Sequence, residues 1–315
     1  MAIRSGLAAQ LGIGIETTVG TAAIPTRFYE FTSESIVQTI ERIESNGLRA
    51  GSRVLRSDRY VSGQKAIEGS VELPVTAGNF GILFKHALGA NATSGSDPYT
   101  HAATMADPFG LGLTVEIGRP GNDGTVRAFT YAGCKIKTLD LKCAVGDLLS
   151  AELGIVGSTA EATGTITAAS YGSTLEVVSF TGAAISVGGT SYPCKDFSLS
   201  LDNGLDAERY VLGANTTREP VAANMAEVTG SLTAEFVDLT AYNRVVNATQ
   251  AAITAVFTGA DGKTVTVSVP VARFDGDTPN VGGPEIVDQQ LTFKGLFNGT
   301  DSPVAITTIN ADSAA

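Results

Sequence analysis

Two stretches of the chain decide its fold: Ile67-Glu68-Gly69-Ser70-Val71-Glu72-Leu73 and Val228-Thr229-Gly230-Ser231-Leu232-Thr233-Ala234. In both, apolar side chains alternate with polar or small ones, which is the two-residue period of a strand with one buried face. Both also carry Gly-Ser at the third and fourth positions. The recurrence of this strand within one chain indicates an internal duplication.

The same elements follow both strands. Apolar residues at helical spacing predict a short amphipathic helix over residues 80–88 and another over 239–246, the second capped by Asp238. Each half then supplies a hairpin, which turns at residues 119–124 in the first half and at 259–262 in the second. Both turns contain Asp-Gly, whose glycine accepts the positive φ that tight hairpins require.

Opening and closing strands complete each half. Alternating apolar residues predict an opening strand at 36–43 and at 197–201, and closing strands over 139–155 and 291–299. Ile136 has the wrong parity for the run after it, which predicts a bulge near Lys137 and Thr138. The fold class expected is mainly β, with two tandem domains, each an antiparallel β-sandwich or half-barrel with one flanking α-helix.

The domain boundaries expected from this plan divide the chain into four parts. Residues 1–157 form the first domain, with an N-terminal arm that extends to about Thr21, and residues 176–303 form the second. The segment 158–175 is rich in Ser, Thr, Ala and Gly and is expected to be a linker or an added edge hairpin. Residues 304–315 lack a core pattern and are expected to be a flexible C-terminal tail.

Composition narrows the function. Charged residues make up 17% of the chain, against about a quarter in typical domains, which favours a surface partly covered by other subunits. The net charge is −11, so the positive bias needed for stable nucleic-acid binding is missing. No stretch has the length and apolar character needed to span a bilayer, so no membrane insertion is expected.

The residue types that carry chemistry do not cluster. His86 and His101 have no partners at metal-ligand spacing, and Cys134, Cys143 and Cys194 form no CxxC pair, so all five are expected to be structural. No nucleophile motif or phosphate-binding glycine motif is present. We therefore expect no enzymatic activity, no catalytic residue, no cofactor and no metal.

One charged feature stands out, a group of arginines that lie mostly in the loops that follow the two opening strands. Its members are Arg42, Arg49, Arg53, Arg56 and Arg59 in the first half and Arg209 and Arg218 in the second. These loops are either simply solvated or contact other subunits, because the guanidinium group pairs bidentately with carboxylates across an interface. Nucleic-acid binding is disfavoured, since Tyr60 is the only aromatic residue beside the first five arginines on which a base could stack.

Several runs resemble a known family. The stretches 9–21, 28–31, 196–205, 228–232 and 257–259 are similar to tail tube proteins, also called major tail proteins, of siphophages, whose long tails do not contract. The resemblance covers nearly the whole chain and rests on the order of strand patterns. It implies two packed antiparallel sheets per domain, a flanking helix and loops that reach neighbouring subunits.

The resemblance also implies partners and a location. The chain is expected in the virion, assembled in the host bacterial cytoplasm, as stacked rings that hold the tape-measure protein and later pass double-stranded DNA without binding it specifically. The tail terminator and distal tail proteins are expected at the tube ends. Two tube domains per chain favour trimeric rings with pseudo-sixfold symmetry, with a hexamer as the second choice. The alternative function is an exported β-rich adhesin or surface-layer protein.

Overall fold

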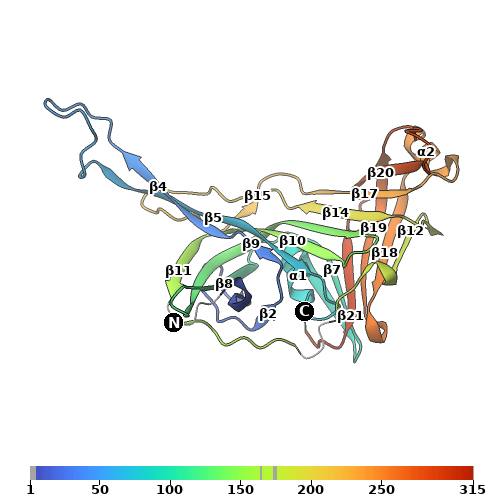
Figure 1. The fold of residues 1–315 in the computed structure, drawn as a ribbon, viewed down its shortest axis with the longest axis horizontal. Coiled ribbons are helices and arrows are strands. Elements are labelled where there is room, and N and C mark those ends of the chain that lie inside the picture. The colour runs from blue at the N-terminus through green and yellow to red at the C-terminus, as the bar shows by residue number, and fades with distance from the viewer. Residues whose placement is uncertain (1–4, 164, 173–175, 315) are drawn as a thin grey trace.

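The structure of the chain is a computed structural model that describes residues 5–163, 165–172 and 176–314. Antiparallel strands dominate these residues, and two short α-helices accompany them, which confirms the mainly β prediction. Figure 1 shows a broad body from which one long two-stranded arm extends.

The elements of the first half of the chain are a short 3-10 helix (Gly6–Ala8), β1 (Gln10–Glu16), β2 (Arg27–Tyr29), β3 (Ser33–Glu34), β4 (Val37–Glu44), β5 (Tyr60–Pro74), α1 (Gly81–Leu88), β6 (Gly89–Gly95), β7 (Tyr99–Met105), β8 (Gly112–Pro120), β9 (Val126–Ala144), β10 (Ser150–Gly157) and β11 (Thr159–Thr163).

Those of the second half are a 3-10 helix (Phe180–Gly182), β12 (Ala183–Val187), β13 (Thr190–Ser191), β14 (Asp196–Asp202), β15 (Leu205–Asp206), β16 (Val221–Ala222), β17 (Glu227–Glu235), α2 (Leu239–Val246), β18 (Ala251–Thr258), a 3-10 helix (Ala260–Gly262), β19 (Thr264–Asp275), β20 (Asp288–Gly295) and β21 (Ala305–Asn310).

One continuous sheet runs through both halves. Its strand order is β4–β5–β10–β9–β14–β17–β20–β19, and every pair is antiparallel. We call these eight strands the joined sheet. The first four come from the first half and the last four from the second, so the two halves meet at the β9–β14 pair.

A second layer covers one face of this sheet. Strands β11–β9–β8–β1–β2 form it in the first half, and β12–β18–β19–β21–β7–β6 form it in the second, where β7 and β6 come from the first half. The long strands β9 and β19 belong to both layers, because each passes from one layer into the other along its length. Residues of both halves contribute to a single set of packed, buried side chains.

The two helices differ in burial. Every residue of α1 except Lys85 is buried, and Leu83 and Phe84 lie in the core. Helix α2 has the predicted cap, since the Thr240 N–H donates to the Asp238 carboxylate at 2.7 Å, but none of its residues is buried. Its apolar residues Leu239 and Val246 are 58% and 60% exposed.

The predicted bulge is confirmed: the β9–β10 register shifts where Thr138 faces Gly154 and Ile136 faces Ile155, which leaves Lys137 unpaired. Two terminal expectations are wrong. Residues 305–310 are not a flexible tail, because β21 pairs with β19 and β7. Residues 10–16 are not a flexible arm either, because β1 pairs with β8 and β2 and buries Leu11 and Ile13.

The described part of segment 158–175 supplies β11, which pairs with β9 at the edge of the second layer. The opening strand of the first half also departs from expectation. Ile40 and Ile43 are exposed, because β4 and β5 leave the body together as the arm and no second layer covers them there. Strand register makes Ile36, rather than Ile40, the equivalent of the buried Leu199.

Candidate assembly surface

The β9–β14 pair is the junction of the two halves and has a regular register. Leu139 faces Leu201 and Leu141 faces Leu199, and all four are buried. The side chain of Asn203 anchors the end of the junction: its amide donates to the carbonyls of Ala87 and Ile136 at 2.7 and 3.0 Å. Since each buried amide proton finds a carbonyl, the junction is fixed by backbone pairing, packing and a buried polar contact.

The glycine at the third position of each repeated strand has a steric reason in this sheet. A Cβ on Gly69, whose φ is +154°, would lie 2.5 Å from the Ile36 Cα, and one on Gly230 would lie 2.2 Å from the Ser198 carbonyl oxygen. Both glycines therefore allow a close approach between the opening strand and the next strand of their own half. Their equivalence also aligns the two halves residue by residue.

The uncovered face of the joined sheet is acidic. On the strands of the body, it carries the acidic residues Glu72, Asp140, Glu152, Asp196, Asp202, Glu227, Glu235, Asp275 and Asp288, against the basic residues Lys142, Arg273 and Lys294. Four of these acids are in ion pairs: Lys294 binds Glu227, Arg273 binds Asp275, and Lys195, just before β14, binds Glu235 and Asp288. Among the described residues, the acids without a basic partner are Glu72, Asp140, Glu152, Asp196 and Asp202.

Several of these acids are direct cross-strand neighbours. Glu152 pairs with Glu72 on one side and with Asp140 on the other, and Asp202 pairs with Glu227. Like charges directly opposite each other destabilise a sheet by some tenths of a kcal/mol, about 0.2–1 for each pair. A row of them is therefore better explained by what this face does than by folding.

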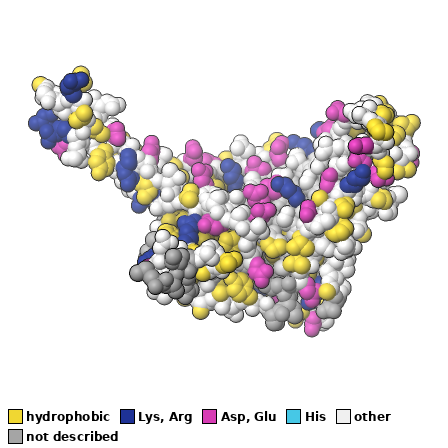
Figure 2. Space-filling view, in the orientation of Figure 1, with side chains coloured by type: hydrophobic (Ala, Val, Ile, Leu, Met, Phe, Trp, Pro, Cys, Tyr) yellow, Lys and Arg dark blue, Asp and Glu magenta, His cyan; other side chains and the backbone are white. Residues whose placement is uncertain are grey.

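The arm places the first group of predicted arginines. Arg42 lies in β4, and the other four lie in the tip segment 45–59 between β4 and β5, where Figure 2 shows basic side chains gathered at the end of the arm. Asp58 binds Arg56 and Arg59 at 3.1 and 3.8 Å.

Within the described part of the chain, Arg42, Arg49 and Arg53 form no ion pair. The tip of the arm also exposes apolar side chains: Leu48 is fully exposed and Val54 is 79% exposed.

The second group lies elsewhere. Arg209 donates to the Glu219 carbonyl at 2.6 Å, and its own carbonyl accepts from the N–H of Arg218, so both belong to the loop between β15 and β16. This loop rests on the root of the arm, where the Lys65 N–H donates to the Asn215 carbonyl and the Tyr210 hydroxyl donates to the Lys65 carbonyl. The structure does not bring the two arginine groups into contact, and it leaves an intersubunit role open.

A buried ion pair fastens the same loop to the first half. Lys135 is 2% exposed, and its ammonium group binds the Glu219 carboxylate at 2.5 Å and the Pro108 carbonyl at 2.8 Å. The Gly110 N–H donates to the same carboxylate oxygen at 2.7 Å. A buried ammonium needs such partners, because its desolvation is costly. Sequence reasoning missed this pair, which joins residues far apart in the chain.

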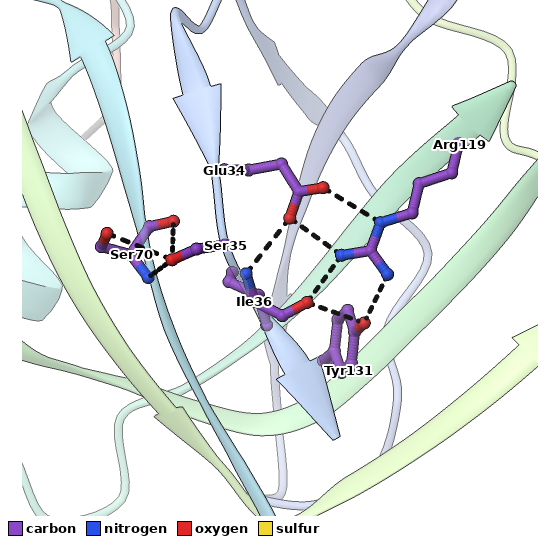
Figure 3. Close-up of polar contacts among 6 residues, drawn as sticks. All are labelled: Glu34, Ser35, Ile36, Ser70, Arg119 and Tyr131. Atoms are coloured by element: carbon purple, nitrogen blue, oxygen red, sulfur yellow. Dashed lines mark hydrogen bonds and ion pairs between the residues drawn. The ribbon is translucent and has the colours of Figure 1, made fainter. Parts of the chain in front are cut away.

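A polar cluster closes part of the free edge of the joined sheet (Figure 3). Glu34 and Arg119 form a bidentate pair at 2.8 and 3.0 Å, and this hydrogen bonding raises the pKa of Arg119. The Glu34 carboxylate also accepts the Ile36 N–H at 3.1 Å, and the Ile36 carbonyl accepts from Arg119 and from the Tyr131 hydroxyl. Side chains thus satisfy both backbone groups of Ile36.

The histidines are buried, and the cysteines are buried or half-buried. Burial raises the pKa of Cys134 and Cys143, and it raises that of Cys194 to about 11, so the thiolate form is suppressed in all three. His86 is buried and its Nδ1 contacts the Ile82 carbonyl at 2.8 Å. His101 lies between the Thr93 hydroxyl and the Asp312 carbonyl.

The comparisons with known proteins decide the family. A model of the family described as phage tail tube protein matches residues 6–295. The chain belongs to this family. The match confirms the resemblance seen in the sequence, and it makes the protein a structural, non-enzymatic component of the virion that assembles with copies of itself into a tube. No curated protein sequence matches the chain.

The described residues contain no group of three or more His, Cys, Asp or Glu side chains arranged to hold a metal ion. Neither α1 nor α2 has the length and apolar character of a membrane-crossing helix.

Proposed function

We propose that this tail tube subunit builds the non-contractile tube of a siphophage, and that the uncovered face of the joined sheet lines a channel for the tape-measure protein and then for double-stranded DNA. The observation that carries the proposal is the acidic face of a sheet that is continuous through both halves and has one edge in each half. A negatively charged wall repels the phosphate backbone, so DNA slides past without stable contacts.

Strand number supports three chains in each ring. Each chain brings the eight strands of the joined sheet, so three chains close a barrel of 24. With strands about 4.8 Å apart and tilted by about 40°, that barrel has a backbone diameter of about 48 Å. After side chains are allowed for, it admits a duplex roughly 20 Å thick. Six chains would give about 96 Å by the same geometry.

Cryo-electron microscopy of purified protein and of phage particles tests this architecture. We expect rings with threefold symmetry and pseudo-sixfold shape, stacked into tubes, with a tail terminator and a distal tail protein at the ends in the particle. A barrel of about 48 strands would establish the hexamer instead. A protein that stays monomeric at high concentration, with no ring in any particle, would refute the proposal.

Charge reversal tests the channel face. Asp140→Lys with Glu152→Lys puts two positive charges in the middle of the acidic row, where both side chains are partly exposed. We expect tubes to form and DNA ejection to slow, because the wall then attracts phosphate. Glu30→Lys is the matched control, an exposed acid after β2 in the second layer. Equal ejection rates for the two variants would contradict the assignment of the face.

The arm arginines are proposed as contacts with other subunits, and the unpaired residues of the tip test this best. Arg49→Glu with Arg53→Glu reverses two exposed charges that have no ion pair among the described residues. We expect a folded protein that no longer forms long tubes. Arg127→Glu is the control, an exposed arginine in the β8–β9 hairpin. Normal tubes in both variants would show that the arm arginines are merely solvated.

A further inference from the structure

The joined sheet has two free edges, and the junction inside the chain provides a template for how they meet. At the first edge, β4 pairs with β5 and with no other strand of the described residues. At the second, β19 pairs with β20 over residues 272–275, while its pairing with β18 on the other side ends at Ala272. In the first half, β9 corresponds to β19 and β8 corresponds to β18. The pairing of β9 with β8 ends at Cys134, and beyond that point β14 pairs with the same edge of β9.

Strand register gives the equivalent residues. Gly69 and Gly230 are equivalent, so Ile67 and Val228, two residues before each, are equivalent too. Gln38 pairs with Ile67 and Leu201 pairs with Val228, which makes Gln38 the equivalent of Leu201. At the other edge of the sheet, the same glycines make Thr292 of β20 equivalent to Gly154 of β10. Asp275 of β19 pairs with Thr292 and Thr138 of β9 pairs with Gly154, so Asp275 and Thr138 are equivalent. The residue after each, Gly276 or Leu139, is therefore also equivalent.

From this template we infer that β4 of one copy pairs antiparallel with the end of β19 in a second copy, with Gln38 opposite Gly276 and Thr39 opposite Asp275. These pairs repeat Leu201–Leu139 and Asp202–Thr138 of the internal junction. The inference rests on the proposed ring and adds its register. Because the two edges differ, the contact is heterologous and propagates around a ring until it closes.

The direction of the backbone groups agrees with this register. At the junction the Asn203 N–H donates to the Lys137 carbonyl and the Val145 N–H donates to the Lys195 carbonyl. Antiparallel bonding alternates, so Leu139–Leu201 and Leu141–Leu199 are the bonded pairs. Pro279 lies beyond the end of β19 and outside the proposed pairing, so its missing N–H does not affect the bonds to the neighbouring strand.

The cluster at Ile36 sets the end of the new pairing. Ile36 is equivalent to Leu199, whose backbone groups face Leu141 at the junction. In β4 those groups are already taken by Glu34, Arg119 and Tyr131. Free edge groups therefore begin at Gln38, and the incoming strand is bonded from Gly276 back into β19.

The exposed apolar side chains of β4 need a cover of this kind. Val37, Ile40 and Ile43 are 49%, 39% and 54% exposed on an edge strand that carries no proline. Such an edge pairs readily with another chain. A second copy of this chain is the occupant indicated, because the end of its β19, beside β20 and beyond the last residue paired with β18, is in the position at which β9 pairs with β14.

Disulfide formation tests the register. In Thr39→Cys with Asp275→Cys the two positions lie at opposite edges of the eight-strand sheet, about 34 Å apart at 4.8 Å for each of the seven strand spacings, so a bond within one chain is impossible. Both residues are exposed, and an unbonded antiparallel pair brings Cα atoms to about 4.5 Å, within disulfide reach. The matched control is Thr39→Cys with Asp277→Cys, which is shifted by two residues.

After mild oxidation we expect most of the Thr39/Asp275 variant in covalent oligomers that end at the trimer on non-reducing gels. We expect at least tenfold less product from the shifted variant and from each single-cysteine variant, which also controls for the half-buried Cys194. Rings seen by microscopy that link only through the shifted pair, or through neither pair, would overturn the register and leave the ring intact. Wild-type protein that forms no ring would overturn the proposed function itself.

Discussion

Lys135 provides the sharpest test of how the two halves are held together. Lys135→Met keeps an unbranched side chain, one heavy atom shorter, and removes its charge. Glu219 then loses its contact at 2.5 Å, and the Pro108 carbonyl loses the donor at 2.8 Å but keeps the Leu111 N–H at 3.1 Å. Removing one partner of a buried ion pair costs about 3–5 kcal/mol. Glu219 is 20% exposed and keeps the Gly110 N–H, so water offsets part of this and we expect about 2–4 kcal/mol.

Thermal unfolding measures this loss. With an unfolding entropy of about 2.1 cal/mol/K per residue, the 315-residue chain has about 0.66 kcal/mol/K, so Tm should fall by about 3–6 °C. Lys195→Met is the control, because its pairs with Asp288 and Glu235 are exposed to solvent. Adding Glu219→Gln to Lys135→Met should recover part of the loss, since no unpaired carboxylate remains. Equal Tm values for Lys135→Met and Lys195→Met would refute the reasoning.

Three further predictions concern single positions. Gly69→Ala should lower the unfolding free energy measured in urea by roughly 3 kcal/mol or more, because the new Cβ would lie 2.5 Å from backbone atoms. Gly146→Ala is the control, since this glycine has φ +99° but open space around it, and it should cost about 1–2 kcal/mol. Similar losses for the two variants would argue against the close approach at Gly69. Burial lowers the pKa of His86, so the unfolded chain binds the proton more readily and the unfolding free energy should fall on acidification below about pH 6.5, by at most ~1.4 kcal/mol per pH unit. His86→Leu should make the unfolding free energy depend less on pH when it is measured at pH 7.5, 6.5 and 5.5. An unchanged pH dependence would contradict this. Glu152→Gln removes two like-charge contacts with Glu72 and Asp140 and should raise the unfolding free energy by about 0.2–1 kcal/mol for each contact, which urea unfolding would report as a higher midpoint. A lower midpoint would show that these acids do not repel.

The sequence by itself determined the local elements. Two-residue alternation located the strands around Gly69 and Gly230, helical spacing located α1 and α2, and the parity of Ile136 located the bulge, because each pattern reflects which side chains must face a core. The order of these elements also indicated the duplication and the resemblance to tail tube proteins. Charge composition predicted against stable binding of nucleic acid, since affinity for phosphate depends on positive charge.

Only the tertiary structure decided which distant strands meet. Periodicity shows that a strand has a buried face but not which edge it pairs with, so the β9–β14 junction and the pairing of β21 with β7 were not foreseen. The Lys135–Glu219 pair and the Glu34–Arg119 cluster at Ile36 were hidden for the same reason. Each joins groups that are separated by dozens of residues along the chain and come close only once the sheets have packed.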